Sequence, residues 1–216
     1  MLVALPWFCK HNYASKQLMQ KMSVLLKSMA EVQAGHPFRG SVPAIKGGNA
    51  YALQMRDLNP SGEVAWDGVV CTEIDARKPI QWLEPGDVVF VARGARNYAV
   101  CLKEVPKPTV CSPNFFLIRI NSPVLLPEFL AWQINRAPAQ RYFASSAEGS
   151  DQLSIRRPVL EALPVSVPTL VQQRLIVSLA EAAVHEERQL QALIHNRQKQ
   201  LDALAFALVS NNLEMN

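Results

Sequence analysis

The sequence predicts an α+β protein in which a mixed globular domain is followed by one long C-terminal α-helix. All 9 glycines and all 15 prolines lie at or before Pro168, so the last 48 residues contain no helix breaker. Short apolar segments typical of strands come first along the chain, and helical segments follow them. Hydrophobic residues make up 49% of the chain and charged residues 19%, a balance that excludes a disordered protein.

The globular domain is expected over residues 21–168, after an N-terminal extension of residues 1–20. The extension begins with an apolar stretch that Pro6 interrupts and that no basic residue precedes, so it makes a poor signal peptide. Residues 23–32 fit a strand or a short helix equally well. Strands are predicted from short apolar or alternating runs between turns, at residues 50–58, 88–92, 99–102, 115–120 and 160–167.

Two helices are predicted in the last third of this domain. The first covers residues 127–136 and begins with Pro127, because the first helical position does not need the N–H group that proline lacks. Its buried face would come from Phe129, Leu130, Trp132 and Ile134. A second, shorter helix is predicted at residues 139–144.

The long helix is predicted to begin after Pro168 and to form a separate segment at residues 169–210, followed by a tail at 211–216. Thr169 and Gln172 have the T-x-x-Q spacing of a capping box, which marks a helix N-terminus. Nothing interrupts the helix up to Val209, so it could extend about 60 Å at 1.5 Å per residue.

One stripe of this helix, called the seam below, follows the 3–4 spacing of a coiled coil. It consists of Ile176, Ala180, Ala183, Glu187, Leu190, Ile194, Arg197, Leu201, Leu204 and Leu208. The alternative is an amphipathic helix that lies on its own domain, but a domain of 168 residues has a radius of gyration of only about 15 Å. We therefore expect the seam to pair with another helix, and the two charged positions to fix register or orientation.

The positive charge of the chain belongs to the globular domain. Residues 1–168 carry 18 Lys and Arg against 13 Asp and Glu, a net charge of +5, whereas the remaining residues have a net charge of −1. Such a balance suits a domain that contacts phosphates, although it is also common in proteins that bind nothing acidic. The four cysteines are not clustered, which disfavours zinc and is typical of reduced thiols in a cytoplasmic protein.

The sequence contains none of the common catalytic motifs. A phosphate-binding GxxxxGK[ST] loop, a GxGxxG turn, an HExxH pair and a GxSxG elbow are all missing. The four histidines lack metal-ligand spacing, and no two carboxylates are placed for acid–base work. Nothing in the sequence therefore argues for an enzyme, and we expect no cofactor and no metal ion.

Three polar loops are candidate nucleic-acid contacts. They are residues 39–49, where three glycines let the backbone approach a phosphate, residues 93–98, and residues 149–157. Arginine can contact guanine with two hydrogen bonds and asparagine can contact adenine. The candidates are Arg39, Lys46, Arg93, Arg96, Asn97, Tyr98 and Arg156, with Arg39 and Arg156 assigned to phosphates. The alternative for each is an ordinary solvated loop side chain.

Four short motifs occur in a fixed order along the chain. They are LEPGDVVFVARG at 83–94, LPEFL at 126–130, a glycine turn at 149–150 with LEALPV at 160–165, and PTLVQQRLI at 168–176. In this order, and with a long helix behind them, residues 22–210 resemble one half of the DNA-specificity (S) subunit of type I restriction-modification systems.

This resemblance implies a non-catalytic subunit, with a target-recognition domain that reads a DNA half-site and a helix that packs antiparallel against a second such helix. It also implies methyltransferase (M) subunits as partners, which bring S-adenosylmethionine, and through them a possible restriction (R) subunit. S subunits carry two recognition domains and two helices, whereas this chain has one of each. A homodimer would resolve the difference and would read a two-fold symmetric, interrupted site; pairing with a different half-subunit remains open. The competing function is a coiled-coil protein–protein adaptor without specific DNA binding.

Overall fold

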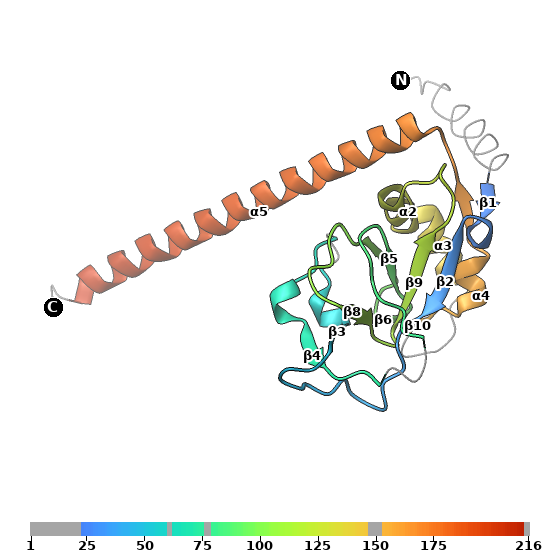
Figure 1. The fold of residues 1–216 in the computed structure, drawn as a ribbon. Helices are drawn as coiled ribbons and strands as arrows, with labels where there is room; N and C mark the ends of the chain where they lie inside the picture. Colours follow the sequence, from blue (N-terminus) through green and yellow to red (C-terminus); the bar gives the residue numbers. More distant parts are fainter. Residues whose placement is uncertain (1–22, 60–61, 76–78, 147–152, 214–216) are drawn as a thin grey trace, which may run out of the picture. The chain divides into compact units, whose positions relative to one another are not determined.

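Figure 1 shows the computed structural model, which describes residues 23–59, 62–75, 79–146 and 153–213. The expected N-terminal extension and residues 149–152 of the third candidate loop lie outside these residues. The chain divides into two compact units, Met1–Arg174 and Leu175–Asn216. No helix in the described part of the chain is long and apolar enough to cross a membrane.

A four-stranded antiparallel sheet forms the centre of the first unit, in the order β2 (Ala30–Ala34), β9 (Phe115–Ile120), β5 (Val88–Val91) and β7 (Ala99–Cys101). All four residues of β5 are buried, which explains why this strand is a continuous apolar run rather than an alternating one. β5 and β9 coincide with the predicted runs, and β7 returns antiparallel to β5 as expected.

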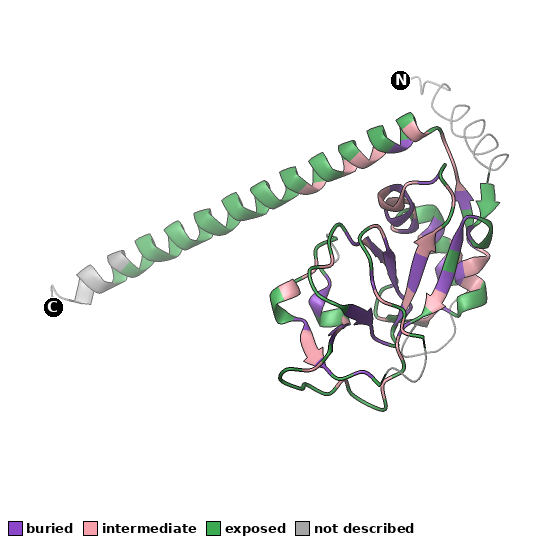
Figure 2. Ribbon diagram, in the orientation of Figure 1, coloured by how far each residue is buried: buried purple, intermediate pink, exposed green. Residues whose placement is uncertain are grey.

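A second sheet of three strands packs against one face of the first. Its order is β4 (Val70–Thr72), β3 (Ala50–Leu53) and β8 (Thr109–Cys111), with β3 parallel to β8. The core between the two sheets includes Leu53 and Cys111 from this sheet and Val89, Val100 and Leu117 from the first. Figure 2 shows this buried interior in purple.

Helices cover the other face of the four-stranded sheet. α2 (Pro127–Ile134) begins with its proline as predicted, and α3 (Ala137–Ser146) follows it. The ring of Phe143 in α3 lies 5.0 Å from that of Phe90 in β5. On α2, Phe129, Leu130 and Ile134 are buried as expected, but Trp132 is only half-buried.

Two predicted strands are partly wrong. The strand expected at 50–58 ends at Leu53, and a 3-10 helix, η2 (Met55–Asp57), follows because Asp57 caps the backbone N–H of Gln54. The strand expected at 160–167 is reduced to β11 (Pro164–Ser166). Leu160 instead lies in a short helix, α4 (Arg157–Glu161), whose first turn contains a proline.

The segment left open at 23–32 contains both kinds of structure. β1 (Ser23–Leu25) pairs antiparallel with β11, and a 3-10 helix, η1 (Leu26–Ser28), leads into β2. The remaining short elements are η3 (Trp66–Gly68), β6 (Arg93–Gly94) and β10 (Leu153–Ser154).

The long helix is confirmed as α5 (Leu170–Leu213), a single uninterrupted element of 44 residues. The capping box is also confirmed, because the N–H of Gln172 donates to the hydroxyl of Thr169 at 3.4 Å and Thr169 donates back to the Gln172 amide oxygen at 3.1 Å. Most described residues of α5 are exposed, and the ribbon of this helix is mostly green in Figure 2.

The first turn of α5 belongs to the first unit because Gln173 is fully buried there. Its amide oxygen accepts from the backbone N–H of Leu126 at 2.9 Å. Its amide nitrogen donates to the carbonyls of Val124 at 2.7 Å and Pro168 at 2.8 Å.

Candidate nucleic-acid interface

The turn that leaves β5 is held in shape by its own buried asparagine. The amide nitrogen of Asn97 donates to the carbonyl oxygens of Val91 at 3.0 Å and Ala92 at 3.2 Å. Only 7% of Asn97 is exposed. Residues 93–97 form the tip of this turn, called the arginine tip below. Gly94 lies in it with a φ of 150°, a conformation that residues with side chains rarely adopt. The tip is therefore well defined, and Arg93 and Arg96 project from it into solvent.

Asn97 therefore differs from our expectation that it would contact a base. An asparagine amide has two N–H donors, and here both of its hydrogen bonds are made inside the turn. Tyr98 differs in part, because it is half-buried against the core between the two sheets. This burial raises the pKa of its hydroxyl above the ordinary value.

Two of the three candidate loops meet in the fold. β6 pairs antiparallel with β10, so Arg93 lies opposite Ser154 and Gly94 opposite Leu153. The N–H of Ile155 extends the contact by donating to the carbonyl of Ala92 at 2.9 Å. The exposed Arg156 follows directly. Arginines some sixty positions apart in the chain are thus carried by paired segments of one surface.

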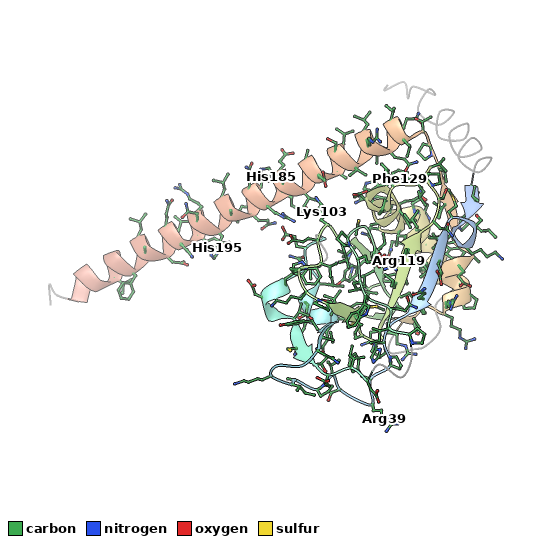
Figure 3. All side chains as sticks on the ribbon, viewed as in Figure 1. Arg39, Lys103, Arg119, Phe129, His185 and His195 are labelled. Atoms are coloured by element: carbon green, nitrogen blue, oxygen red, sulfur yellow. The ribbon has the colours of Figure 1, made fainter. Side chains whose placement is uncertain are left out.

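The remaining candidate loop, residues 39–49, lies in a longer connection that is fixed at its two ends. At one end the N–H of His36 donates to the carbonyl of Cys111 at 2.7 Å, and at the other the side chain of Asn49 bonds both the N–H and the carbonyl of Ile74. Arg39 and Lys46 lie between these ends and are exposed. Figure 3 shows Arg39 at the periphery of the domain, pointing away from it.

Asp87, one of two acidic residues in the first motif, holds the turn at the start of β5 in place. Asp87 is 2% exposed and accepts two hydrogen bonds from the guanidinium of Arg119, at 2.8 and 2.7 Å. It also accepts the N–H of Glu84 at 2.7 Å, which closes the turn before β5. The hydrogen bonds to Asp87 raise the pKa of Arg119 above its ordinary value. Asp87 is therefore a structural residue that fixes the start of the strand leading to Arg93.

Sequence reasoning missed the contribution of η2. A side chain at Gly94 would meet the sulfur end of Met55, which places η2 beside the arginine tip. Arg56 follows Met55, and 64% of its side chain is exposed. No local pattern predicts this neighbour, because about forty residues separate it from the tip. The only signal in the sequence was Arg56 itself, and the chain contains many other arginines.

The described residues hold no group of three or more His, Cys, Asp and Glu side chains that could bind a metal ion. An open hollow of about 840 Å³ lies on the domain and is lined by Arg56, Trp66 and Lys103 together with Glu63 and Glu104. Its charges are of both signs, so it does not single out one class of ligand.

No protein-family model and no curated protein matches this sequence. Solved structures do match it. One is the S subunit of a type I restriction-modification system from M. genitalium, with 13% identity and a TM-score of 0.51 over 82% of this chain and 42% of that one. Another is the HsdS subunit from Thermoanaerobacter tengcongensis, with 14% identity and a TM-score of 0.50 over 83% and 45%.

A third match comes from a structure that describes complex assembly and conformational transition of the type I R-M system. It has 16% identity and a TM-score of 0.55 over 89% of this chain and 50% of that one. This chain thus spans about half the length of the S subunits it matches or less. The resemblance seen in the four sequence motifs is confirmed for the fold: the chain has the architecture of one half of a type I restriction-modification S subunit.

Proposed function

We propose that this chain is a specificity subunit of a type I restriction-modification complex, in which the first unit reads a DNA half-site. The observation that carries the proposal is the pairing of β6 with β10, which brings the segment of Arg93 and Arg96 beside the segment of the exposed Arg156 in a domain with this fold. Exposed arginines on a rigid turn suit readout of base edges, because a fixed backbone positions the guanidinium for two hydrogen bonds.

Within this proposal the arginines have different tasks. Arg93 and Arg96 contact bases, because they project from the tip that Asn97 holds in shape. Arg39 and Arg156 contact phosphates, and Lys46 extends the surface from the other loop. Tyr98 can present only the exposed part of its ring.

Replacement of Arg96 by alanine tests the assignment. We expect Arg96→Ala to weaken binding to the specific site by about 10- to 100-fold, since one good base contact contributes about 1–3 kcal/mol. Binding to unrelated DNA should change much less. The exposed Arg141 of α3 provides a matched control as Arg141→Ala. An equal loss on specific and unrelated DNA would reassign Arg96 to the phosphate backbone.

The partners follow from the same proposal. M subunits would supply the methyltransferase activity and S-adenosylmethionine, an R subunit could join through them, and a second copy of this chain would supply the other half-site reader. Co-expression with candidate M subunits, followed by mapping of methylated sites, tests this assembly. Methylation that needs M alone, or that has no sequence preference, would contradict it.

A coiled-coil adaptor is the second candidate, and the exposed apolar side chains of α5 favour it: Leu190 is 53% exposed and Leu204 63%. Salt dependence separates the two functions. A DNA reader loses affinity steeply as salt rises, because each phosphate it neutralises releases counterions. An adaptor has no such slope, because it binds no DNA.

A further inference from the structure

In a single copy of the chain, the seam of α5 leaves large apolar side chains exposed. Leu190, Ile194, Leu201 and Leu204 are between 52% and 63% exposed, and they share one face of an unbroken helix. A contiguous apolar stripe of this kind is typical of a surface that another helix covers. His185 and His195, labelled in Figure 3, fall outside the seam.

Glu187 and Arg197 are the two charged members of the seam, and neither has an opposite charge three or four residues away along its own helix. The positions three and four residues away are Ala183, Val184, Leu190 and Gln191 for Glu187, and Leu193, Ile194, Gln200 and Leu201 for Arg197. The two charges are ten residues apart, about 15 Å along the axis, so they cannot pair with each other in one chain. An opposite charge within the seam can therefore come only from a partner helix.

We propose that Glu187 and Arg197 set the register of an antiparallel pair formed by α5 and the α5 of a second copy, about a two-fold axis at residue 192. This rests on the homodimer of the proposed function and adds its geometry. The axis places Glu187 opposite Arg197 of the second copy, and symmetry makes this ion pair twice. It also places Leu190 opposite Ile194, Ala183 opposite Leu201 and Ala180 opposite Leu204, so small residues face large ones.

Other arrangements leave the charges without partners. A shift of one heptad in one direction sets Glu187 against Leu204 and Arg197 against Ile194 of the second copy. The opposite shift sets Glu187 against Leu190 and Arg197 against Ala180. Each shift also removes two of the ten seam positions from the contact. A parallel pair places Glu187 against Glu187 and Arg197 against Arg197, which is repulsive. Polar residues in a coiled-coil seam commonly select one register in this way.

Charge exchange in the full-length chain tests the register. Glu187→Arg should raise the dimer dissociation constant on the order of 100-fold, because two Arg–Arg contacts replace two ion pairs. Arg197→Glu should do the same through two Glu–Glu contacts. The double variant E187R/R197E restores both ion pairs and serves as the matched control, with a dissociation constant close to that of the wild type. Analytical ultracentrifugation measures the dimer dissociation constants of the wild type and the three variants.

Disulfide formation tests the direction of the pairing independently. Ala183→Cys and Leu201→Cys variants, mixed and oxidised with glutathione disulfide, should form a cross-linked dimer. Each variant alone should not, because its two copies of the new cysteine would be about 27 Å apart along the axis, far beyond disulfide range. Wild-type protein treated in the same way sets the background from the native cysteines.

The outcomes separate the register from the proposed function. Cross-linking of Ala183→Cys alone, or single charge variants that dimerise like the wild type, would overturn the register and leave a dimeric reader intact. A wild-type mass near 24.0 kDa at every concentration would overturn the homodimer together with its register. DNA binding by Arg96→Ala is unaffected by either result and tests the reader separately.

Discussion

Asp87 fixes the beginning of the first sequence motif, which ends at the arginine tip. The carboxylate is buried and is held by two hydrogen bonds from Arg119, which Figure 3 labels, and by the backbone N–H of Glu84. A buried carboxylate without its counter-charge is unfavourable because the interior solvates it poorly. The pair therefore fixes the start of β5, the strand that ends two residues before Arg93.

Replacement of Arg119 by methionine removes this counter-charge and keeps an unbranched, though shorter, side chain. We expect Arg119→Met to lower the free energy of unfolding by about 2–4 kcal/mol, because Asp87 remains buried without it. Arg157→Met is the matched control: its partner Glu161 lies 2.7 Å away but half of the Arg157 side chain is exposed. That control should cost less than about 1 kcal/mol. Equal losses in urea unfolding would show that the Asp87 pair has no special role.

The buried thiol of Cys111 makes stability depend on pH. Burial raises the pKa of Cys111 to about 12 from an ordinary value of 9.0. The folded state therefore holds the thiol proton more tightly, so its contribution is complete below pH 9 and is lost as the pH rises from 9 to 12. Between pH 9 and 11, Cys111→Ala should lose stability less steeply than wild type, by about 1.4 kcal/mol per pH unit. Parallel pH profiles in urea unfolding would contradict this.

The candidate site could be predicted only in part from the sequence. Arg39, Lys46, Arg93, Arg96 and Arg156 are exposed as expected, because charged side chains in polar loops rarely find buried partners. Asn97 could not be placed, since its burial depends on two carbonyls that face inward only after β5 and β7 have paired. The contact between Gly94 and Met55 was equally invisible, because it joins distant segments.

Among the secondary-structure elements, the junction between the domain and α5 depends on two adjacent glutamines with different tasks. Gln172 completes the exposed capping box with Thr169. Gln173 is buried and satisfies one N–H and two carbonyl groups of the backbone. The capping box was predictable because it is local. The role of Gln173 was not, because its partners at Val124 and Leu126 lie nearly fifty residues earlier.

Substitution of each glutamine separates the two tasks. Gln173→Leu keeps the volume but leaves three backbone groups without partners, so we expect a loss of about 2–4 kcal/mol in the free energy of unfolding. Gln172→Ala, the matched control, should cost less than about 1 kcal/mol because only an exposed cap is lost. Similar small losses for both variants in urea unfolding would mean that the buried amide does not anchor the helix.

The other elements show the same difference between local sequence signals, which could be predicted, and long-range contacts, which could not. Buried runs such as β5 and β9 were predicted because their apolar sequence is sufficient. The strand expected at 160–167 was wrong because the run began inside α4, where Pro158 favours the first turn of a helix. A short apolar run does not show by itself whether it forms a strand or a helix. The strand that pairs with it decides this, and for β11 that strand is β1.

For the whole molecule, we propose that one DNA-reading domain and one long helix become a symmetric reader when two copies of the chain pair. The S subunits that this chain matches are about twice its length. Two identical half-site readers related by a two-fold axis see inverted sequences, and the length of the paired helices fixes the distance between them. The bound DNA should therefore carry the symmetry of the protein.

The symmetric reader can be tested by incubating the full-length chain with a pool of random double-stranded DNA and sequencing the DNA that it binds. We expect the enriched sequences to contain two inverted copies of one short motif, separated by a spacer of constant length. The double variant R93A/R96A should lose this enrichment. Enrichment of a single asymmetric motif, or a bound pool with the composition of the starting pool, would contradict the account.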